Sequence, residues 1–327
     1  MADATVSRLG LVNNTGTNFD ELFLKVFSGE VLTSFTRNNI FNEQLHSVRT
    51  IASGKSASFP VLGTATAAYH SVGTPLVGAN QIKANEKIIT IDDLLISQAF
   101  VAQIDELKNH YDVRATYADE LGKALAKQYD INVAKVIANA SRTSTTLSGG
   151  NGGTVLTLAS GNTNSAAVTG DELAAAIYDI AQTFDERDIP TTDRFCVLPP
   201  AEYYKLAEEA TRTVDTDFNP QGNGSFASGK IQQIAGIPVM MSNSVPQTNR
   251  SAVTGENNTY SGDDSKTIGL VFHKSAVGTV KLMDMKTEIS GSDYNLMYQG
   301  TLMIAKYLLG HGVLRPECAA TIKLSAS

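Results

Sequence analysis

The stretch VRATYADELGKALAKQYDINVAKVIANA, residues Val113–Ala140, decides the fold class of this chain. Apolar side chains recur in it at every fourth position, the spacing that places them along one face of an α-helix. They are Tyr117, Leu121, Leu125, Tyr129, Val133 and Ile137. At 1.5 Å of rise per residue, such a helix is about 37 Å long. The sequence therefore predicts one long amphipathic rod.

Upstream of the rod, the residue pattern predicts a long β-hairpin. Ser56–Leu62 has the composition of an extended segment, and Pro60 places it at a sheet edge because proline cannot donate a ladder hydrogen bond. A matching β-rich run follows at Glu86–Ile91. The connection between them is rich in Gly, Ala and Thr, with Tyr69 as its one aromatic residue. A connection of that length is either functional or disordered, so we expect a projecting hairpin with a functional tip.

Downstream of the rod, the glycine-rich linker 148–153 leads into a second region. Thr169 and Glu172 fit a helix capping box, and an apolar stripe at helical spacing follows them. The stripe consists of Leu173, Ile177, Ile180 and Phe184. We expect strands at Phe195–Leu198, Ile237–Met241 and Ile268–His273, a helix from Pro200 to about Ala210, polar segments at 211–230 and 243–266, and mainly strands over 279–324 with breaks at 290–291 and 315–316. The predicted fold class is α+β.

Composition and charge restrict the function. At 327 residues, the chain is long enough for about two domains. The formal net charge of -7 argues against a protein that grips nucleic acid, which needs clustered Lys and Arg. Charged residues make up 18%, below the roughly 25% of average soluble proteins, as expected either where neighbouring subunits cover much of the surface or where the core is large.

Cysteine usage and the terminus suggest where the chain is made. Cys196 and Cys318 are the two cysteines, too few and too far apart for a disulfide framework, which favours a reducing compartment. The first residues, 1–11, lack a basic region followed by an apolar run, so we expect no secretory signal. No stretch approaches the ~18 apolar residues that span a bilayer. We expect a cytosolic origin, and a short helix near Glu21–Phe35 within an N-terminal arm.

One short motif suggests a phosphate-binding loop. Gly54-Lys55-Ser56 matches the end of that motif, which also needs a glycine five residues before Gly54. Position 49 is Arg, and the residues that follow favour a strand where the motif needs a helix. We interpret the three residues as a turn entering the hairpin.

The other polar residues form no recognisable catalytic or metal motif. No histidine is followed by another four residues later, so the zinc-hydrolase spacing is missing. His311, between two glycines, is interpreted as a turn histidine that hydrogen-bonds the backbone. The adjacent pairs Asp92-Asp93 and Glu208-Glu209 point their side chains apart, and Cys196 is expected to be inert in an apolar strand. We predict no catalytic residue, no cofactor and no metal.

Several sequence blocks, in order along the chain, resemble the major capsid protein of T-seven-like podoviruses, which are short-tailed double-stranded DNA phages. The blocks are FLKVFSGEVLTSF (23–35), SGKSASFPVLG (53–63), EKIITID (86–92), NHYDVR (109–114), HKSAVGTVKL (273–282), IAKY (304–307) and GHGVLRPE (310–317). The segment 143–265 departs most from the family, apart from GIPV at 236–239.

This resemblance implies the Hong-Kong-97-type phage capsid fold. It assigns residues 1–53 to an N-terminal arm, 54–95 to an extended-loop hairpin, 96–160 to a peripheral domain with a long spine helix, 161–278 to an axial domain, and 279–327 to C-terminal strands of the peripheral domain. The hairpin would lie across a neighbouring subunit. Its candidate contact residues are Phe59, Pro60, Tyr69 and Lys83.

The resemblance also implies a structural role in the virion. Many copies would assemble as hexamers and pentamers, with a scaffolding protein, a portal protein and an optional cement protein, into an icosahedral shell around double-stranded DNA that is not specifically bound. Assembly would take place in the host cytoplasm. Some relatives of this fold cross-link a lysine of the extended loop to a neighbour, whereas we expect no such bond at Lys83.

Two other functions compete with this interpretation. A bacterial nanocompartment (encapsulin-type) shell has the same fold but encloses cargo enzymes, and the podovirus-type blocks at 53–63 and 304–317 argue against it. A soluble metabolic enzyme is the third hypothesis, which the lack of catalytic motifs disfavours.

Overall fold

The computed structural model of this chain describes residues 41, 44–63, 65, 67–75, 78, 82–108, 114–147, 150–158, 168–208, 224–225, 230–231 and 233–324. They form two compact units, each assembled from separate parts of the chain. The described residues of unit 1 lie in 93–129 and 283–309, and those of unit 2 in 40–92, 130–282 and 310–327. The helix expected near Glu21–Phe35 lies outside the described residues.

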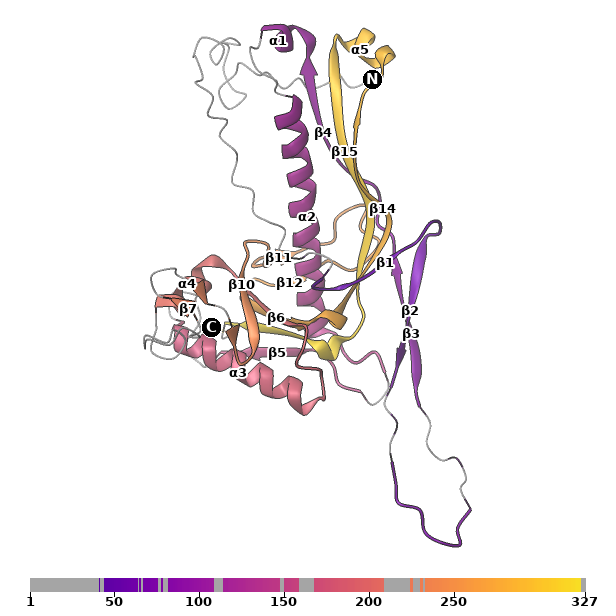
Figure 1. The fold of residues 1–327 in the computed structure, drawn as a ribbon, viewed down its shortest axis with the longest axis vertical. Coiled ribbons are helices and arrows are strands. Elements are labelled where there is room, and N and C mark those ends of the chain that lie inside the picture. The colour runs from indigo at the N-terminus through magenta and orange to yellow at the C-terminus, as the bar shows by residue number, and fades with distance from the viewer. Residues whose placement is uncertain are drawn as a thin grey trace. The chain divides into compact units, whose positions relative to one another are not determined.

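The predicted rod is confirmed as helix α2, Arg114–Arg142, which is 29 residues long and passes from unit 1 into unit 2 (Figure 1). In unit 1 its apolar stripe packs on two strands, β4 (Leu95–Ala102) and β15 (Gly300–Val313). The packed side chains are Tyr117, Leu121, Leu125 and Tyr129 from the helix and Leu95, Val101, Met303, Ala305, Tyr307 and Leu309 from the strands. In unit 2, Val133 and Ile137 of the same stripe are fully buried.

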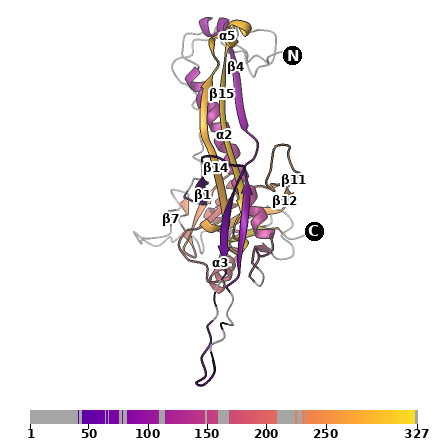
Figure 2. The same cartoon turned by 90° about the vertical axis from the view of Figure 1, so that its right-hand side faces the viewer.

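Strands β4 and β15 pair antiparallel, from Gly300 opposite Ala102 to Tyr307 opposite Leu95, and run side by side in Figure 2. Strand β14 (Val277–Ile289) is the other neighbour of β15. Short helices α1 (Gln103–Lys108) and α5 (Ser292–Tyr298) follow β4 and β14 along the chain.

Helix α5 corrects the expectation of mainly strand in the C-terminal tail. The break expected at Ser290-Gly291 is present, but a helix follows it, with Gly291 as its N-cap. The rings of Tyr294 and Tyr298, one helical turn apart, lie 4.5 Å from each other, and Phe100 meets Tyr294 edge-on at 6.4 Å. These aromatic contacts stabilise a helix where the local pattern favoured a strand.

Unit 2 is built on a six-stranded mixed sheet with the order β5-β16-β13-β6-β10-β9. The strands are β5 (Thr154–Thr157), β16 (Ala319–Lys323), β13 (Thr267–His273), β6 (Arg194–Leu198), β10 (Ile237–Met241) and β9 (Gln233–Ile234). Parallel and antiparallel pairs alternate irregularly in it, as in α+β folds. The apolar runs that predicted β6, β10 and β13 are confirmed as strands.

Helices α3 (Gly170–Glu186) and α4 (Pro200–Glu208) belong to the same unit. The predicted capping box is present, since the Thr169 side chain accepts from the Glu172 backbone and the Glu172 carboxylate accepts from the Thr169 backbone. The apolar stripe of α3 is buried as predicted. Within the predicted polar segments, the structure adds two short strand pairs, β7 (Gly224–Ser225) with β8 (Lys230–Ile231) and β11 (Asn249–Arg250) with β12 (Gly262–Asp263).

The predicted hairpin is confirmed in unit 2. Strands β2 (Ser56–Leu62) and β3 (Ala84–Thr90) pair antiparallel with each other and form a separate two-stranded sheet, so Pro60 lies at an edge as expected. Upstream, β1 (Ser47–Thr50) pairs parallel with the start of β14. The hairpin thus leaves unit 2 next to the beginning of β14 and the end of β15.

Candidate inter-subunit contact site: the hairpin and its glycine seat

The end of β3 lies on three glycines, which we call the glycine seat: Gly278, Gly310 and Gly312. A Cβ atom on Gly310 would lie 2.0 Å from the carbonyl oxygen of Thr90, far inside contact distance. Cβ atoms on Gly278 and Gly312 would lie 2.9 and 2.8 Å from the side chain of Ile89. Ile89 is only 1% exposed. The hairpin can therefore approach β14 and β15 this closely only because these positions carry no side chain.

Beside the seat, two consecutive asparagines grip the chain where it leaves the hairpin; we call Asn257 and Asn258 the asparagine clasp. The backbone N–H groups of Asn257 and Asn258 donate to Asp92 Oδ1 at 2.8 and 3.2 Å, and Asn258 Nδ2 donates to it at 3.0 Å. The Asn257 side chain donates to Ile91 O at 2.7 Å, and the Asn258 side chain donates to Thr90 O at 2.6 Å. Thr90 N donates back to Asn258 Oδ1 at 3.2 Å. Thr90, Ile91 and Asp92, where the chain leaves the hairpin, are thus all hydrogen-bonded to two residues far away in sequence.

Tyr260 links the clasped carboxylate to β15. Its hydroxyl donates to Asp92 Oδ2 at 2.5 Å and accepts from the backbone N–H of His311 at 3.0 Å. Burial raises the pKa of Tyr260, so the hydroxyl keeps the proton that it donates. Burial also raises the pKa of Asp92, while the hydrogen bonds from Tyr260 and the clasp oppose that shift. The acidic pair Asp92-Asp93 therefore supplies one structural acceptor, in line with the expectation that it forms no two-carboxylate site.

His311 corrects a sequence interpretation. It lies within strand β15, not in a turn, and its ring Nδ1 is 2.8 Å from the hydroxyl of Thr279. The pKa of His311 is lowered to about 3, mainly by burial and also by the nearby charges of His46 and Lys281. The flanking glycines that suggested a turn are members of the glycine seat instead, so they serve close packing and not chain reversal.

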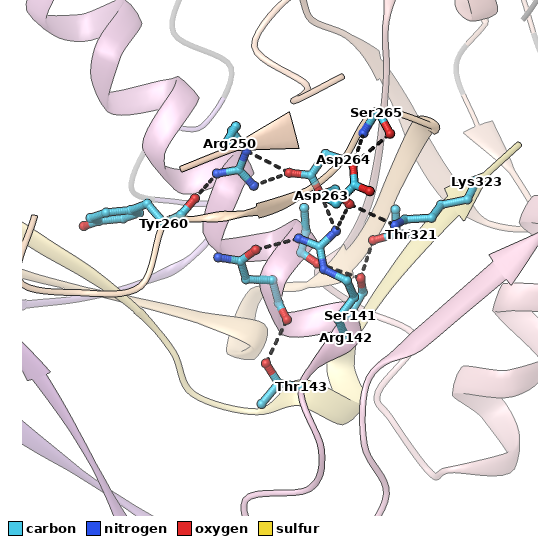
Figure 3. Close-up of polar contacts among 12 residues, drawn as sticks. Ser141, Arg142, Thr143, Arg250, Tyr260, Asp263, Asp264, Ser265, Thr321 and Lys323 are labelled. Atoms are coloured by element: carbon cyan, nitrogen blue, oxygen red, sulfur yellow. Dashed lines mark hydrogen bonds and ion pairs between the residues drawn. The ribbon is translucent and has the colours of Figure 1, made fainter. Parts of the chain in front are cut away.

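The segment that carries the clasp is fixed at its base by a buried ion cluster (Figure 3). Asp264 is fully buried and accepts from Arg142 Nη1 at 2.5 Å and from Arg250 Nε at 2.8 Å. Two guanidinium groups therefore compensate one buried carboxylate, which alone would be costly to bury. Asn139 Nδ2 donates to Thr259 O at 2.9 Å, so the segment is also tied to the last turns of α2.

The far end of the paired strands is held as well. Gly63 N donates to Lys83 O at 2.8 Å, which closes the ladder. Asn85 Nδ2 donates to Thr146 O at 2.7 Å, and a Cβ on Gly63 would lie 3.6 Å from Leu147 Cδ1. The segment after α2 therefore contacts the hairpin at the point where its strands end.

Two of the four candidate contact residues lie on β2. Phe59 is partly buried, with the guanidinium of Arg49 at 5.8 Å from its ring centroid, while Arg49 Nη1 donates to Ser58 O at 2.7 Å. Pro60 is exposed and lies opposite Glu86 of β3. Phe59 thus has a partner within its own chain, whereas Pro60 presents its ring to the surface.

The other two candidates lie beyond the ladder. Tyr69 is fully exposed at 107% and Val72 at 100% of their reference areas. Lys83 is exposed where β3 is about to begin. The structure does not bring Tyr69 together with Phe59 and Pro60; it places them on separate parts of the hairpin. Val72 was missed by sequence reasoning, although a bulky apolar residue in a small-residue connection is the same signal that singled out Tyr69.

Catalytic chemistry finds little support in the described residues. No group of three or more His, Cys, Asp or Glu side chains among them could hold a metal ion. Cys196 is buried in β6, where burial raises the pKa of its thiol to about 12. A strand, not a helix, follows Gly54, as the turn interpretation requires. Within the described part of the chain, no helix is both long and apolar enough to span a membrane.

Comparison with known proteins gives the family. A family model described as Gp10A-like major capsid protein matches residues 58–323. The chain belongs to this family. The Gp10A-like protein is 35% identical to the major capsid protein of Escherichia phage T7, over 92% of this chain and 91% of that protein. It is 34% identical to the major capsid protein of Enterobacteria phage T3, over 93% of this chain and 91% of the relative.

Solved structures agree. The capsid protein in the structure of cyanophage P-SCSP1u matches with a TM-score of 0.83 and 48% identity, over 100% of both chains. The mature capsid of bacteriophage PhiM1 has the same fold, with a TM-score of 0.74 at 19% identity. The predicted Hong-Kong-97-type α+β fold and the resemblance to T-seven-like major capsid proteins are therefore confirmed. This Gp10A-like protein is a major capsid protein, a structural component of the virion, and the nanocompartment alternative is not favoured.

Proposed function

We propose that this Gp10A-like protein builds the phage head as hexamers and pentamers, with the hairpin tip of each copy laid against a neighbouring copy. The observation that carries this proposal is the full exposure of Tyr69 and Val72. Bulky apolar side chains that pack on nothing in their own chain are characteristic of interaction surfaces. Most described residues around them are small or polar, which leaves both apolar side chains accessible to another copy.

The remaining candidate contacts would form a second part of the interface, on and beside the hairpin strands. Pro60 would pack through its exposed ring, Phe59 through the part of its ring that Arg49 leaves uncovered, and Lys83 through its charge. We propose that Lys83 forms no covalent cross-link. Denaturing electrophoresis of particles should then give monomer at 34.8 kDa, and a ladder of multimers would contradict this.

We propose that the parts of the chain follow the assignment made from the sequence. Residues 1–53 would be the arm, 54–95 the extended loop, 96–160 the peripheral domain with its spine helix, 161–278 the axial domain and 279–327 the returning peripheral strands. The continuous helix α2 supports the spine, and helices α3 and α4 with strands β6, β10 and β13 would form most of the axial domain, in one sheet with β5 and β16 from the flanking segments.

Partners other than the chain itself are proposed on the family's structural role. A scaffolding protein and a portal protein would direct assembly in the host cytoplasm, and a cement protein could add to the finished shell. The shell would enclose double-stranded DNA without specific binding, which the net charge of -7 supports. We propose no enzymatic activity and no cofactor.

Deleting 64–77 tests the role of the tip. The variant should stay folded, because the described tip residues lie outside the buried core, but it should not form stable particles. Circular dichroism and negative-stain microscopy measure the two properties. A milder pair is Val72→Ser against Val253→Ser, the control being an exposed valine of unit 2 outside the hairpin. Normal particles from the deletion variant would refute the proposal.

A further inference from the structure

The hairpin strands and the hairpin tip have different surroundings within unit 2. Strands β2 and β3 are held at one end by the glycine seat and the asparagine clasp, and at the other by the hydrogen bond from Asn85 Nδ2 to Thr146 O, next to the ladder bond between Gly63 and Lys83. Fastening at two separated places stops a two-stranded ribbon from pivoting about either one.

The described tip residues, 65, 67–75, 78 and 82, are not fastened in this way. Their hydrogen bonds are confined to a local turn in which Thr74 donates from its N–H and its hydroxyl to Ser71 O. Gly73 and Gly78 have positive φ angles of 91° and 64°, and nothing lies within 4 Å of where their Cβ atoms would be. No described tip residue is tied to the rest of the chain.

We infer that β2 and β3 are a fixed bracket of unit 2 up to the hydrogen bond between Gly63 and Lys83, and that the described tip residues adjust to their surroundings. Gly63 has no side chain to resist rotation, and its N–H makes the last ladder bond before the tip. The whole hairpin therefore does not swing from its root at Thr90–Asp92. Only what the tip binds rests on the proposed function; the position of the pivot rests on contacts within unit 2.

The bracket reduces the cost of binding. Ordering a residue costs backbone entropy, so an interface element that is already fixed along most of its length loses less entropy on association. A short adjustable end can still meet neighbours in slightly different positions, as hexamers and pentamers require. Asn258 is the positioning residue of the bracket, because its side chain bonds to both Thr90 and Asp92.

Spin-label distances in the full-length chain test the inference. One label at Ala175→Cys on α3 would be paired with Glu86→Cys on β3 or with Val72→Cys in the tip; all three positions are exposed. Native Cys196 and Cys318 are 0% and 2% exposed, and unsubstituted protein controls for their labelling. In unassembled subunits, the Glu86 distance distribution should be at most half as wide as the Val72 distribution. On assembly, its mean should stay unchanged.

Variants of the asparagine clasp test whether the clasp is what holds β3 in place. Asn258→Ala should at least double the width of the Glu86 distribution, whereas Asn249→Ala, an exposed asparagine of the same segment, should not change it. Tyr260→Phe removes a single hydroxyl from the same network and should broaden the distribution less, which keeps the test valid if Asn258→Ala misfolds. A Glu86 distribution as wide as that of Val72, or unaffected by both clasp variants, would overturn the inference. If only the Val72 distribution fails to narrow on assembly, the proposed tip contact is wrong and the fixed bracket stands.

Discussion

The root and the tip of one hairpin differ in almost every physical respect. At the root, Ile89 is 1% exposed, and Thr90–Asp92 is hydrogen-bonded to residues from a distant segment. In the tip, Tyr69 and Val72 are fully exposed. Burial at the root contributes to the free energy of folding of the subunit, whereas the fully exposed side chains of the tip contribute nothing to it. The comparison shows that one supersecondary element can belong to the core at one end and to an interface at the other.

Glycine has a different purpose at each end. In the seat, Gly310 allows the backbone of Thr90 to approach, which any side chain would prevent. In the tip, Gly73 and Gly78 adopt left-handed backbone conformations that other residues rarely take, with open space around them. Substitution should therefore displace a neighbour at the root but only strain the local backbone in the tip.

The largest expected effect comes from the base of the clasp segment. Asp264→Ala leaves Arg142 and Arg250 without their buried carboxylate and should lower the free energy of unfolding by about 4 kcal/mol. The adjacent Asp263→Ala is the matched control, because that side chain is exposed and bonds only to nearby Ser265. Urea unfolding of unassembled subunits measures both. Equal midpoints for the two variants would mean that the ion cluster does not stabilise the root.

A somewhat smaller effect is expected at the seat. Gly310→Ala forces a methyl group against the Thr90 carbonyl and should cost about 3 kcal/mol, the upper end of typical overpacking penalties. Gly291→Ala, where nothing lies within 4 Å and φ is -75°, should cost less than about 1 kcal/mol. Thermal unfolding compares the pair. A Gly310→Ala subunit as stable as the control would show that the root can yield, which contradicts the fixed bracket.

Acid should weaken the root and leave the tip unaffected. The pKa of His311 is lowered from 6.5 to about 3, mainly by burial. At pH values between about 3 and 6.5, the ring is therefore neutral in the folded chain and takes up a proton when the chain unfolds. The free energy of unfolding should therefore fall as the pH drops from about 6.5 toward 3, by up to about 1.4 kcal/mol per pH unit. Melting temperatures between pH 7 and 4 should fall less steeply for His311→Gln than for the unsubstituted chain. His70→Gln, in the exposed tip, should keep the original slope; a slope unchanged in both variants would argue against a buried neutral His311.

The smallest expected effect on the subunit is in the tip. Tyr69→Ala should change the free energy of unfolding by less than about 0.5 kcal/mol, because the side chain packs on nothing in its own chain. The same substitution should raise the subunit concentration needed for particle formation, measured by light scattering. Phe59→Ala is the informative partner, since it also loses the contact with Arg49 and should affect stability as well as assembly. If Tyr69→Ala destabilised the subunit but left assembly normal, Tyr69 would belong to the folded core and not to an interface.

Predictions from the sequence succeeded where the signal is local. The four-residue spacing predicted α2, the Thr169–Glu172 box predicted the start of α3, and the proline-bearing run predicted strand β2. Each depends on interactions among residues close in sequence, so a single chain segment carries the information. The resemblance to T-seven-like capsid proteins added the family, because its blocks span both ends of the chain.

Other features could not be predicted this way. Helix α5 was missed; besides the local pair Tyr294 and Tyr298, its aromatic contacts include Phe100, which is far away in sequence and cannot be found from a local pattern. His311 was interpreted as a turn residue because flanking glycines have two meanings, chain reversal and close packing, and only a neighbour distinguishes them. Asn257 and Asn258 look in the sequence like any pair of polar loop residues. Their role in the clasp depends on side-chain amide bonds to Ile91 and Thr90, which lie far away in the sequence.

The sequence by itself determined helices α2, α3 and α4, most of the strands, the presence of a hairpin with an apolar residue in its tip, and, through the resemblance, the family. The tertiary structure alone decided which end of that hairpin is fixed. Asp92 meets Asn257, Asn258 and Tyr260 across more than 160 intervening residues. A carboxylate gains its hydrogen bonds only when folding brings such partners within about 3 Å, and no local pattern encodes that approach.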